Sequence, residues 1–220
     1  MGARGGLWAA VWLMGLALGM GQTLPSPGAI WAGYGDIYLE RGEVETALHL
    51  YQRALELDPD LQEAAAGEAA ALALLERREE ALSKLDAYLE RHPDSPLVLH
   101  VRGQVRFLQG WVSGAYRDLK RAYELNPAEP LYALAYARAA VVVGAWGEGR
   151  AVLSTLLEEG VPKEIQDQAV SLLYLLLYLS RSQALFNERG SGDEAGSLVH
   201  GPGTVCPLHP GRNLSGPDWT

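Results

Sequence analysis

The 220-residue sequence has only one cysteine and no excess of basic residues. Its single cysteine, Cys206, excludes an intramolecular disulfide framework. Acidic residues outnumber lysine and arginine, 27 against 18, and the net charge of −9 gives no indication of a basic surface that follows phosphates. Nucleic acid is therefore not an expected partner.

The sequence also lacks the common enzyme motifs that bind phosphates, bind zinc or present a nucleophilic serine. It contains no G-x-x-x-x-G-K-[ST], no H-E-x-x-H and no G-x-S-x-G. Cys206 and His209 have metal-like spacing, with His200 nearby, but a zinc site would need a second cysteine pair. We therefore expect no catalysis, no cofactor and no metal site.

The first 21 residues differ in composition from the rest of the chain. Arg4 is followed by uncharged residues as far as Gly21, with small residues at Ala17 and Gly19. A charged start, an apolar centre and small residues at a cleavage point are typical of a secretory signal peptide, so we expect export with cleavage near residue 21. An uncleaved N-terminal anchor is the alternative, because the uncharged stretch is borderline in length for a bilayer core of about 30 Å. A buried first helix is the third interpretation.

Prolines recur at a fixed interval in the middle of the chain. Pro59, Pro93 and Pro127 are 34 residues apart, and a proline cannot continue a helix. Four further columns, mostly of small residues, share this period: Gly35, Ala69 and Gly103; Gly42, Glu76 and Gly110; Ala47, Ala81 and Ala115; Ala54, Tyr88 and Ala122. Internal repetition at such a period indicates an array of identical supersecondary units.

These columns resemble the tetratricopeptide repeat, a 34-residue helix–turn–helix with Trp, Leu-Gly, Tyr, Ala, aromatic and Pro at set spacings. The first repeat matches this pattern at Trp31, Gly35, Tyr38, Ala47, Tyr51, Ala54 and Pro59, with Tyr34 where leucine is usual. The second repeat lacks the tryptophan, and the fourth matches more loosely. The resemblance implies an all-α fold, a right-handed helical solenoid of tetratricopeptide helix-turn-helix repeats with an extra C-terminal helix.

The expected organisation follows from the same columns. After the segment 1–21, the array is expected at 29–161, with repeats at about 28–61, 62–95, 96–129 and 130–161. A C-terminal capping helix is expected at 162–186. The remaining residues, 187–220, are rich in glycine and proline and are expected to form a disordered tail.

Close crossing of two helices explains the small residues of the first repeat. We expect Gly35 to face Ala47 and Ala54, and Gly42 to supply the left-handed residue that ends the first helix. Since interiors tolerate few voids, tyrosines are expected to fill the volume beside the crossing. These tyrosines are Tyr34, Tyr38 and Tyr51.

The resemblance further implies a binding groove, because the first helices of such repeats line a concave surface that takes peptides or helices of partner proteins. The residues expected to line it are Asp36, Leu39, His100, Gln104, Phe107 and Arg138. Chaperone-binding members of the family grip a terminal carboxylate with lysine and asparagine in this stripe. Here Ala32 and Asp36 occupy those places in the first repeat, which argues against a carboxylate clamp.

Together these features predict a non-catalytic protein–protein interaction scaffold of the cell envelope or secreted space, either periplasmic or extracellular. The alternative is a membrane-anchored assembly factor or accessory subunit of an envelope complex, held by an uncleaved N-terminus. The sequence does not identify the protein partner.

The expected C-terminal helix is apolar on all sides between Leu172 and Leu179. That run is far shorter than the roughly 20 residues needed to span a bilayer. A helix presents one stripe to one neighbour, and the last helix of a solenoid is expected to have a polar outer face. Besides packing on the fourth repeat, this helix is therefore predicted to make a homodimer contact or to be covered by part of the tail.

Overall fold

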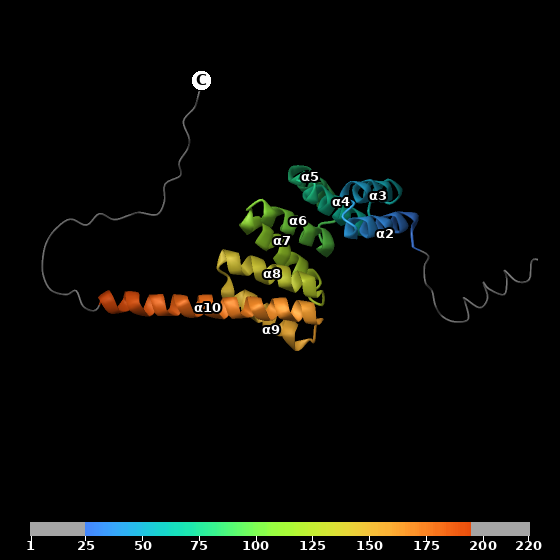
Figure 1. Cartoon of the computed structure of the whole chain (residues 1–220). Coiled ribbons are helices and arrows are strands. Elements are labelled where there is room, and N and C mark those ends of the chain that lie inside the picture. The colour runs from blue at the N-terminus through green and yellow to red at the C-terminus, as the bar shows by residue number, and fades with distance from the viewer. Residues whose placement is uncertain (1–24, 195–220) are drawn as a thin grey trace, which may run out of the picture. The chain divides into compact units, whose positions relative to one another are not determined.

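The computed structural model describes the backbone of residues 25–194 and the side chains of residues 25–185. All regular elements in this part of the chain are α-helices, which confirms the predicted all-α class (Figure 1). The chain divides into two units, Met1–Tyr178 and Leu179–Thr220. The predicted N-terminal segment 1–21 lies outside the described residues, as do Cys206, His209 and His200.

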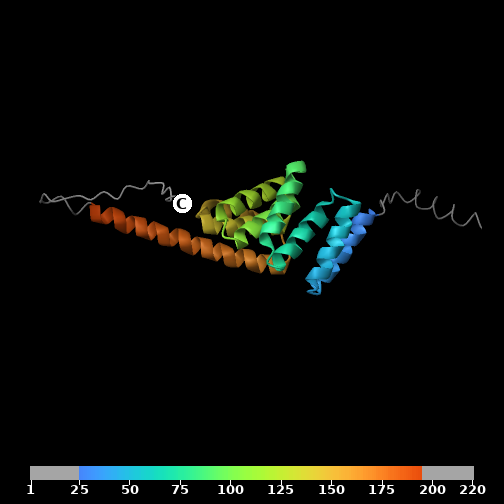
Figure 2. The same ribbon diagram turned by 90° about the horizontal axis from the view of Figure 1, so that it is seen from above.

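The first unit is a stack of antiparallel helix pairs. The pairs are α2 (Pro27–Glu40) with α3 (Val44–Leu57), α4 (Gln62–Leu74) with α5 (Arg78–Arg91), α6 (Pro96–Leu108) with α7 (Val112–Leu125), and α8 (Pro130–Val143) with α9 (Trp146–Glu158). Successive pairs lie side by side, and the first helices of neighbouring pairs also contact one another (Figures 1 and 2). This arrangement confirms the predicted helical solenoid.

The turns inside the pairs depend on left-handed residues. Gly42, Gly110 and Gly144 have φ of 79°, 79° and 80°, so the prediction for Gly42 is confirmed. In the second pair Glu76 takes the same conformation with φ of 61°, the one non-glycine residue with positive φ in the described part of the chain. A side chain in this region costs about 1–2 kcal/mol, so the turn is set by the packing of the helices around it and not by the residue.

The prediction that Gly35 faces Ala47 and Ala54 is wrong, because Gly35 faces an aromatic ring. A Cβ atom on Gly35 would lie 2.6 Å from Cε1 of Tyr51, and one on Gly67 of α4 would lie 2.4 Å from the same atom. The fully buried Tyr51 ring therefore lies between two glycines and joins α2, α3 and α4. The ring needs the space that two absent side chains leave, and this is why both positions are glycine.

Tyr34 also departs from the expectation that it fills the interior. Its side chain is 52% exposed, although Tyr51 is fully buried and Tyr38 is half-buried. Within the described residues, α2 contacts only α3 and α4. The outer side of α2 therefore has no neighbouring helix to cover it, and Tyr34 lies on that side.

The apolar core continues along the stack in two clusters of buried side chains, and Tyr123 packs against both. This is the nearest-neighbour packing expected of a repeat array, in which each pair buries its apolar face only against the next. At the end of the stack, Ala169 and Leu176 of α10 (Lys163–Glu194) are buried in the second cluster, together with side chains of α8 and α9.

Within the described part of the chain, none of the helices combines the length and apolar character that a membrane span needs.

The last helix is longer than predicted. α10 continues past the expected end at residue 186 as far as Glu194, into the segment that was expected to be disordered. Adding a residue to an existing helix requires no new nucleation, whereas each glycine costs about 1 kcal/mol. For this reason the two glycines Gly190 and Gly192 are not enough to end the helix.

Candidate functional site

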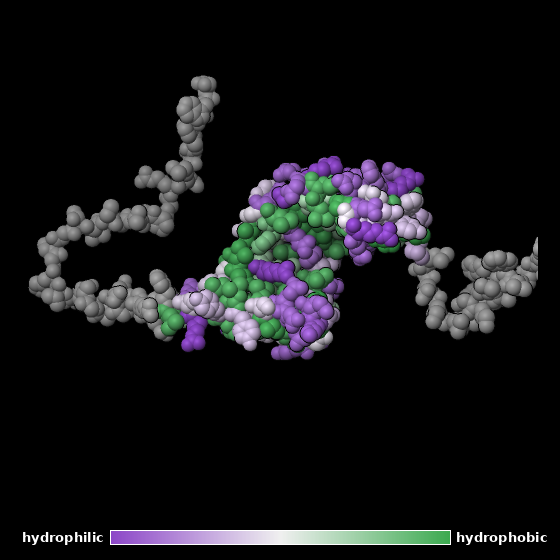
Figure 3. Space-filling view, in the orientation of Figure 1, coloured by the Kyte–Doolittle hydropathy of each residue, from purple (hydrophilic) through white to green (hydrophobic). Residues whose placement is uncertain are grey.

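A cleft opens between α6 and α8, on the surface formed by the first helices of the pairs. It has a volume of about 270 Å³ and is lined by Gln104, Phe107, Leu108, Leu119, Ala135 and Arg138. Most of these side chains are apolar, and Figure 3 shows apolar surface gathered over this part of the first unit, interrupted by hydrophilic side chains. The arrangement suits an apolar ligand with a few polar groups.

The cleft brings together three residues that were predicted to line the groove: Gln104, Phe107 and Arg138. Phe107 is 37% exposed, so part of its ring is available to a ligand that enters the cleft. The guanidinium of Arg138 donates a hydrogen bond to Oε1 of Gln168 on α10 at 2.5 Å. The first turns of α10 thereby form the far wall of the groove.

A second hollow, of about 450 Å³, adjoins the first on the α10 side. Its lining residues are Arg138, Asp167, Gln168, Ser171, Leu172 and Leu175. Arg138 lines both hollows, so they adjoin one another, and the two together, from α6 over α8 to the first half of α10, are called the groove below. The α10 residues of this groove were not among those predicted from the sequence, since the repeat period does not extend into the last helix.

The two predicted groove residues of the first repeat lie apart from this cleft. Asp36 is exposed, but its carboxylate accepts a hydrogen bond from the Tyr51 hydroxyl at 2.7 Å. Burial of the ring, followed by the hydrogen bond to Asp36, raises the pKa of Tyr51. Leu39 is half-buried and packs against the core of the first two pairs. Both residues therefore contribute to the packing of α2.

His100 lies inside the stack and not on the groove surface. It is only 7% exposed, and its ring centroid lies 4.9 Å from that of Tyr132 on α8. Its Nε2 atom lies 2.9 Å from the amide nitrogen of Gln104, whereas Nδ1 is buried without a hydrogen-bond partner among the described residues. The prediction failed because this position of each first helix faces the next first helix, and Ala32, Ala66 and Leu134 are buried in the same way.

The burial of His100 predicts a stability that depends on pH. Desolvation lowers the pKa of this imidazole from 6.5 to about 4, so the unfolded chain binds the proton more readily than the folded chain does. The full stability is therefore present above pH 6.5 and is lost as pH falls from 6.5 towards 4. At pH 4.5 the expected loss from this residue is about 2–3 kcal/mol.

The measurement is urea unfolding of the native chain and of His100→Phe at pH 7.5 and pH 4.5. The phenylalanine keeps a ring against Tyr132 but cannot titrate, and the carboxylates titrate equally in both proteins. We expect the native chain to lose more stability than the variant. An identical loss in the two proteins would contradict the prediction.

Sequence reasoning missed a column of exposed aliphatic side chains at the C-terminal ends of the first helices. Leu74, Leu108 and Val142 are 34 residues apart and are 62%, 64% and 55% exposed. Their equivalent in the first pair is Glu40. The repeat period itself is the signal that finds them, since an apolar residue that recurs at an exposed position in three successive pairs is not needed for packing.

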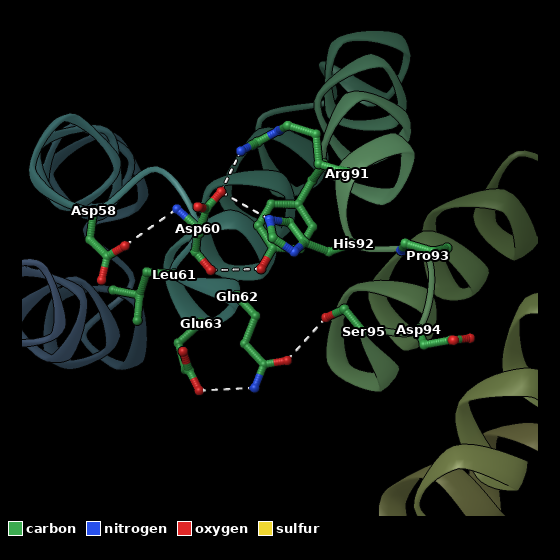
Figure 4. A pocket seen from close by; sticks show the side chains of 11 residues that line it. Asp58, Asp60, Leu61, Gln62, Glu63, Arg91, His92, Pro93, Asp94 and Ser95 are labelled. Carbon is green, nitrogen blue, oxygen red and sulfur yellow. Dashed lines mark hydrogen bonds and ion pairs between the residues drawn. The ribbon is translucent and has the colours of Figure 1, made fainter.

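A separate polar hollow, of about 570 Å³, lies where the connections between pairs meet (Figure 4). Asp60 contacts the guanidinium of Arg91 there, and Nε2 of His92 lies 2.9 Å from its Oδ1 atom. The hydrogen bond with His92 is the main cause that lowers the pKa of Asp60. The Tyr88 hydroxyl donates a hydrogen bond to the backbone carbonyl of Asp60 at 2.8 Å, which ties α5 to the connection between α3 and α4.

Among the described residues, no group of three or more His, Cys, Asp and Glu side chains is placed to hold a metal ion.

Charged networks that the sequence did not reveal lie within the third pair and between neighbouring pairs. Asp118 of α7 is buried and accepts hydrogen bonds from Arg102 at 2.8 and 2.9 Å and from Arg106 at 2.7 Å. Glu148 of α9 accepts hydrogen bonds from Tyr136 of the same pair and from Lys120 and Tyr116 of α7, and these bonds lower its pKa to about 2. Asp86 of α5 also contacts Arg102 and Arg106, and Lys120 and Tyr116 of α7 reach Glu148 from the neighbouring pair, so these contacts connect the repeats.

Comparison with known proteins gives the following similarities. The TPR repeat family profile matches residues 35–65. A thermophilic TPR protein of Thermus thermophilus is similar, with a TM-score of 0.58 and 21% identity over 73% of this chain and 89% of that one. A tetratricopeptide repeat protein of Parabacteroides merdae has a TM-score of 0.52 and 19% identity over 84% of this chain and 73% of its own. A chain of the Naa15/Naa10 structure bound to HypK-THB has a TM-score of 0.59 and 15% identity, over 80% of this chain and 26% of that one. No curated protein matches.

Proposed function

We propose that this chain, whose residues 35–65 match the TPR repeat profile, is a non-catalytic scaffold that binds a peptide or helix of a partner protein in the groove between α6, α8 and α10. Tetratricopeptide repeats generally mediate protein–protein interaction, and stacked repeats create extended concave surfaces suited to it. The observation that carries the proposal is the mainly apolar cleft around Phe107 and Arg138. An exposed apolar cleft with few polar groups is typical of an interaction site.

The test is affinity capture from envelope fractions with the intact chain and with Phe107→Glu. A charge in the middle of the cleft would have to be desolvated when an apolar ligand binds, so we expect the captured partner to be reduced at least tenfold. Leu57→Glu is the matched control, because Leu57 is 47% exposed and ends α3, a second helix outside the groove. A partner retained equally by all three proteins would contradict the proposed site.

We further propose that the chain is exported, on the support of Arg4, the uncharged stretch that follows and the small residues near residue 21. N-terminal sequencing of the natural protein is then expected to begin near Met20 or Gln22. An intact Met1 in a soluble cytoplasmic fraction would contradict export. An intact Met1 in membranes would favour the alternative, a membrane-anchored assembly factor or accessory subunit.

A second proposal concerns self-association through α10. Ala169 and Leu176 are buried against the preceding helices, while Tyr174 and Tyr178 on the opposite side are 70% and 68% exposed. Two exposed tyrosines one turn apart support a homodimer contact around residues 172–179, because soluble monomers seldom expose a large apolar patch. Sedimentation is expected to show a dimer for the native chain and a monomer after Tyr174→Glu with Tyr178→Glu. A native chain that is monomeric at all concentrations would contradict this proposal.

A further inference from the structure

The helix α2, at one end of the stack, exposes four large apolar side chains (Figure 1). Ile30, Trp31, Tyr34 and Ile37 are 38–52% exposed, and their spacings of three, four and seven residues place them on one side of the helix. The rings of Trp31 and Tyr34 contact each other edge to face, so the patch is continuous. These four residues are here called the outer face of α2. Soluble proteins seldom leave such a patch without a partner.

The positions equivalent to the outer face are covered in the other three pairs. In α4 they hold Ala64, Ala65, Glu68 and Ala71, and all four are buried. One and two repeats further along they are again buried, except for the half-buried Arg102. Each of these first helices contacts the second helix of the preceding pair. The outer face of α2 is therefore the side on which a preceding second helix packs elsewhere in this chain.

Gly33 also lies on this side of α2. A Cβ atom there would have nothing within 4 Å, so the described residues give no reason for a glycine, which costs about 1 kcal/mol in a helix. Gly67 is its equivalent in α4, where the glycine makes room for Tyr51 of the preceding second helix. Gly33 has the same explanation if a helix packs on α2 as α3 packs on α4.

The repeat period places one segment of the chain before α2, and that segment lies outside the described residues. Pro25 stands 34 residues before Pro59, so it extends the column of prolines that follow the second helices. Shifted back by one period, the range of α3 becomes residues 10–23. These residues are uncharged and as many as those of α3, and Pro25 follows them as Pro59 follows α3.

The order of residues within 10–23 matches the burial pattern of the second helices. Four positions are exposed in all of α3, α5, α7 and α9, and three positions are buried in all of them. In this segment the exposed positions hold Val11, Gly15, Gly19 and Gln22, and the buried positions hold Leu13, Ala17 and Met20. The segment thus places glycines and its polar residue outward, and larger apolar residues mostly inward.

Contacts between the described pairs indicate which residues of the segment meet α2. Three of them join a second-helix residue to the residue sixteen positions later in the next first helix: Tyr51 with Gly67, Gln52 with Glu68, and Asp86 with Arg102. The same spacing sets Ala17 against Gly33 and Leu18 against Tyr34. Ala17 and Gly33 are both small, so the two helices can approach closely.

We propose that residues 10–23 of the uncleaved chain pack on α2 as a second helix and cover its outer face. The segment then completes the end of the stack by the nearest-neighbour packing that joins the other pairs. The inference concerns the chain before the proposed cleavage, which removes this cover and opens the outer face. It does not depend on the proposed groove.

The test measures how fast a cysteine on the outer face reacts with a maleimide. Ile30→Cys is placed in a chain that also carries Cys206→Ser, so that it is the only thiol. One form is the full chain, made by cell-free synthesis without membranes so that residues 1–21 remain, and the other begins at Gln22. We expect labelling at least tenfold slower in the full chain. Leu108→Cys, 64% exposed on α6, is the matched control and is expected to react equally fast in both forms.

Two substitutions in the segment test its register. Leu18→Glu sets a charge against Tyr34, which is costly to bury without a partner, so the full chain is expected to lose most of its protection. Val11→Glu lies at an outward position and is expected to leave the protection unchanged.

Equal labelling of the full and shortened chains would overturn the inference. Protection that Leu18→Glu and Val11→Glu affect alike would do so as well, because the segment would then not pack in this register. Protection that grows with protein concentration would mean that a second copy covers the outer face. None of these outcomes bears on the proposed groove, which the Phe107→Glu variant tests separately.

Discussion

Replacing Tyr51 with alanine is expected to lower the free energy of unfolding by about 3–5 kcal/mol, the range found for large aromatic residues in cores. The ring is fully buried between Gly35 and Gly67, positions that cannot collapse onto the cavity because neither has a side chain. The substitution also removes the hydrogen bond from the hydroxyl to Asp36. Since native domains are stable by only about 5–15 kcal/mol, the first helix pair is expected to detach from the stack.

The measurement is urea unfolding followed by circular dichroism, with Tyr34→Ala as the control. Tyr34 is 52% exposed, so its loss is expected to change stability by less than about 0.5 kcal/mol. A similar effect of both substitutions would show that Tyr51 does not hold the first pairs together.

The complementary substitution Gly67→Ala tests the same contact from the other side. A Cβ atom there would lie 2.4 Å from the Tyr51 ring, so overpacking is expected to cost about 1–3 kcal/mol. In a chain that already carries Tyr51→Ala, the added methyl group meets a cavity, and the cost is expected to vanish. Additive effects of the two substitutions would contradict the packing of the ring against Gly67.

Replacing Asp118 with alanine is expected to cost about 3 kcal/mol. Asp118 is 5% exposed and pairs with the guanidinium groups of Arg102 and Arg106, whose side chains are 17% and 20% exposed. Removing one partner of a buried ion pair typically costs about 3–5 kcal/mol, because the remaining charge stays desolvated. The lower end is expected here, since Asp86 still contacts both arginines.

Urea unfolding again measures the effect, with Asp94→Ala as the matched control. Asp94 pairs with Arg121 at 2.8 Å, but both side chains are exposed, so its loss is expected to cost less than about 1 kcal/mol. Added salt is expected to weaken the Asp94 pair more than the Asp118 pair, because buried charges are screened less. Equal costs for the two substitutions would mean that the Asp118 network is as solvated as a surface pair.

Local features of the fold could be predicted because they depend on residues close in the chain. A proline such as Pro59 cannot continue the helix before it, and α3 ends at Leu57. A glycine such as Gly42 provides the left-handed turn without a steric cost. The 34-residue period then sets which elements are equivalent, and equivalent elements pack alike. The resemblance to the tetratricopeptide repeat implied a groove along the first helices, and the period then assigned Gln104, Phe107 and Arg138 to it; these three lie together in the cleft.

The contacts between pairs were decided only by the tertiary structure. The period places His100 on a given face of α6, but Tyr132 from the next pair is what covers it, while Leu108 on the same helix remains exposed. Likewise the ring of Tyr51 leaves no room for a side chain at Gly67, a residue of the following pair. Repetition determines the order of residues along each helix, whereas burial depends on the angle at which the next pair packs, and that angle results from side chains distant in the sequence.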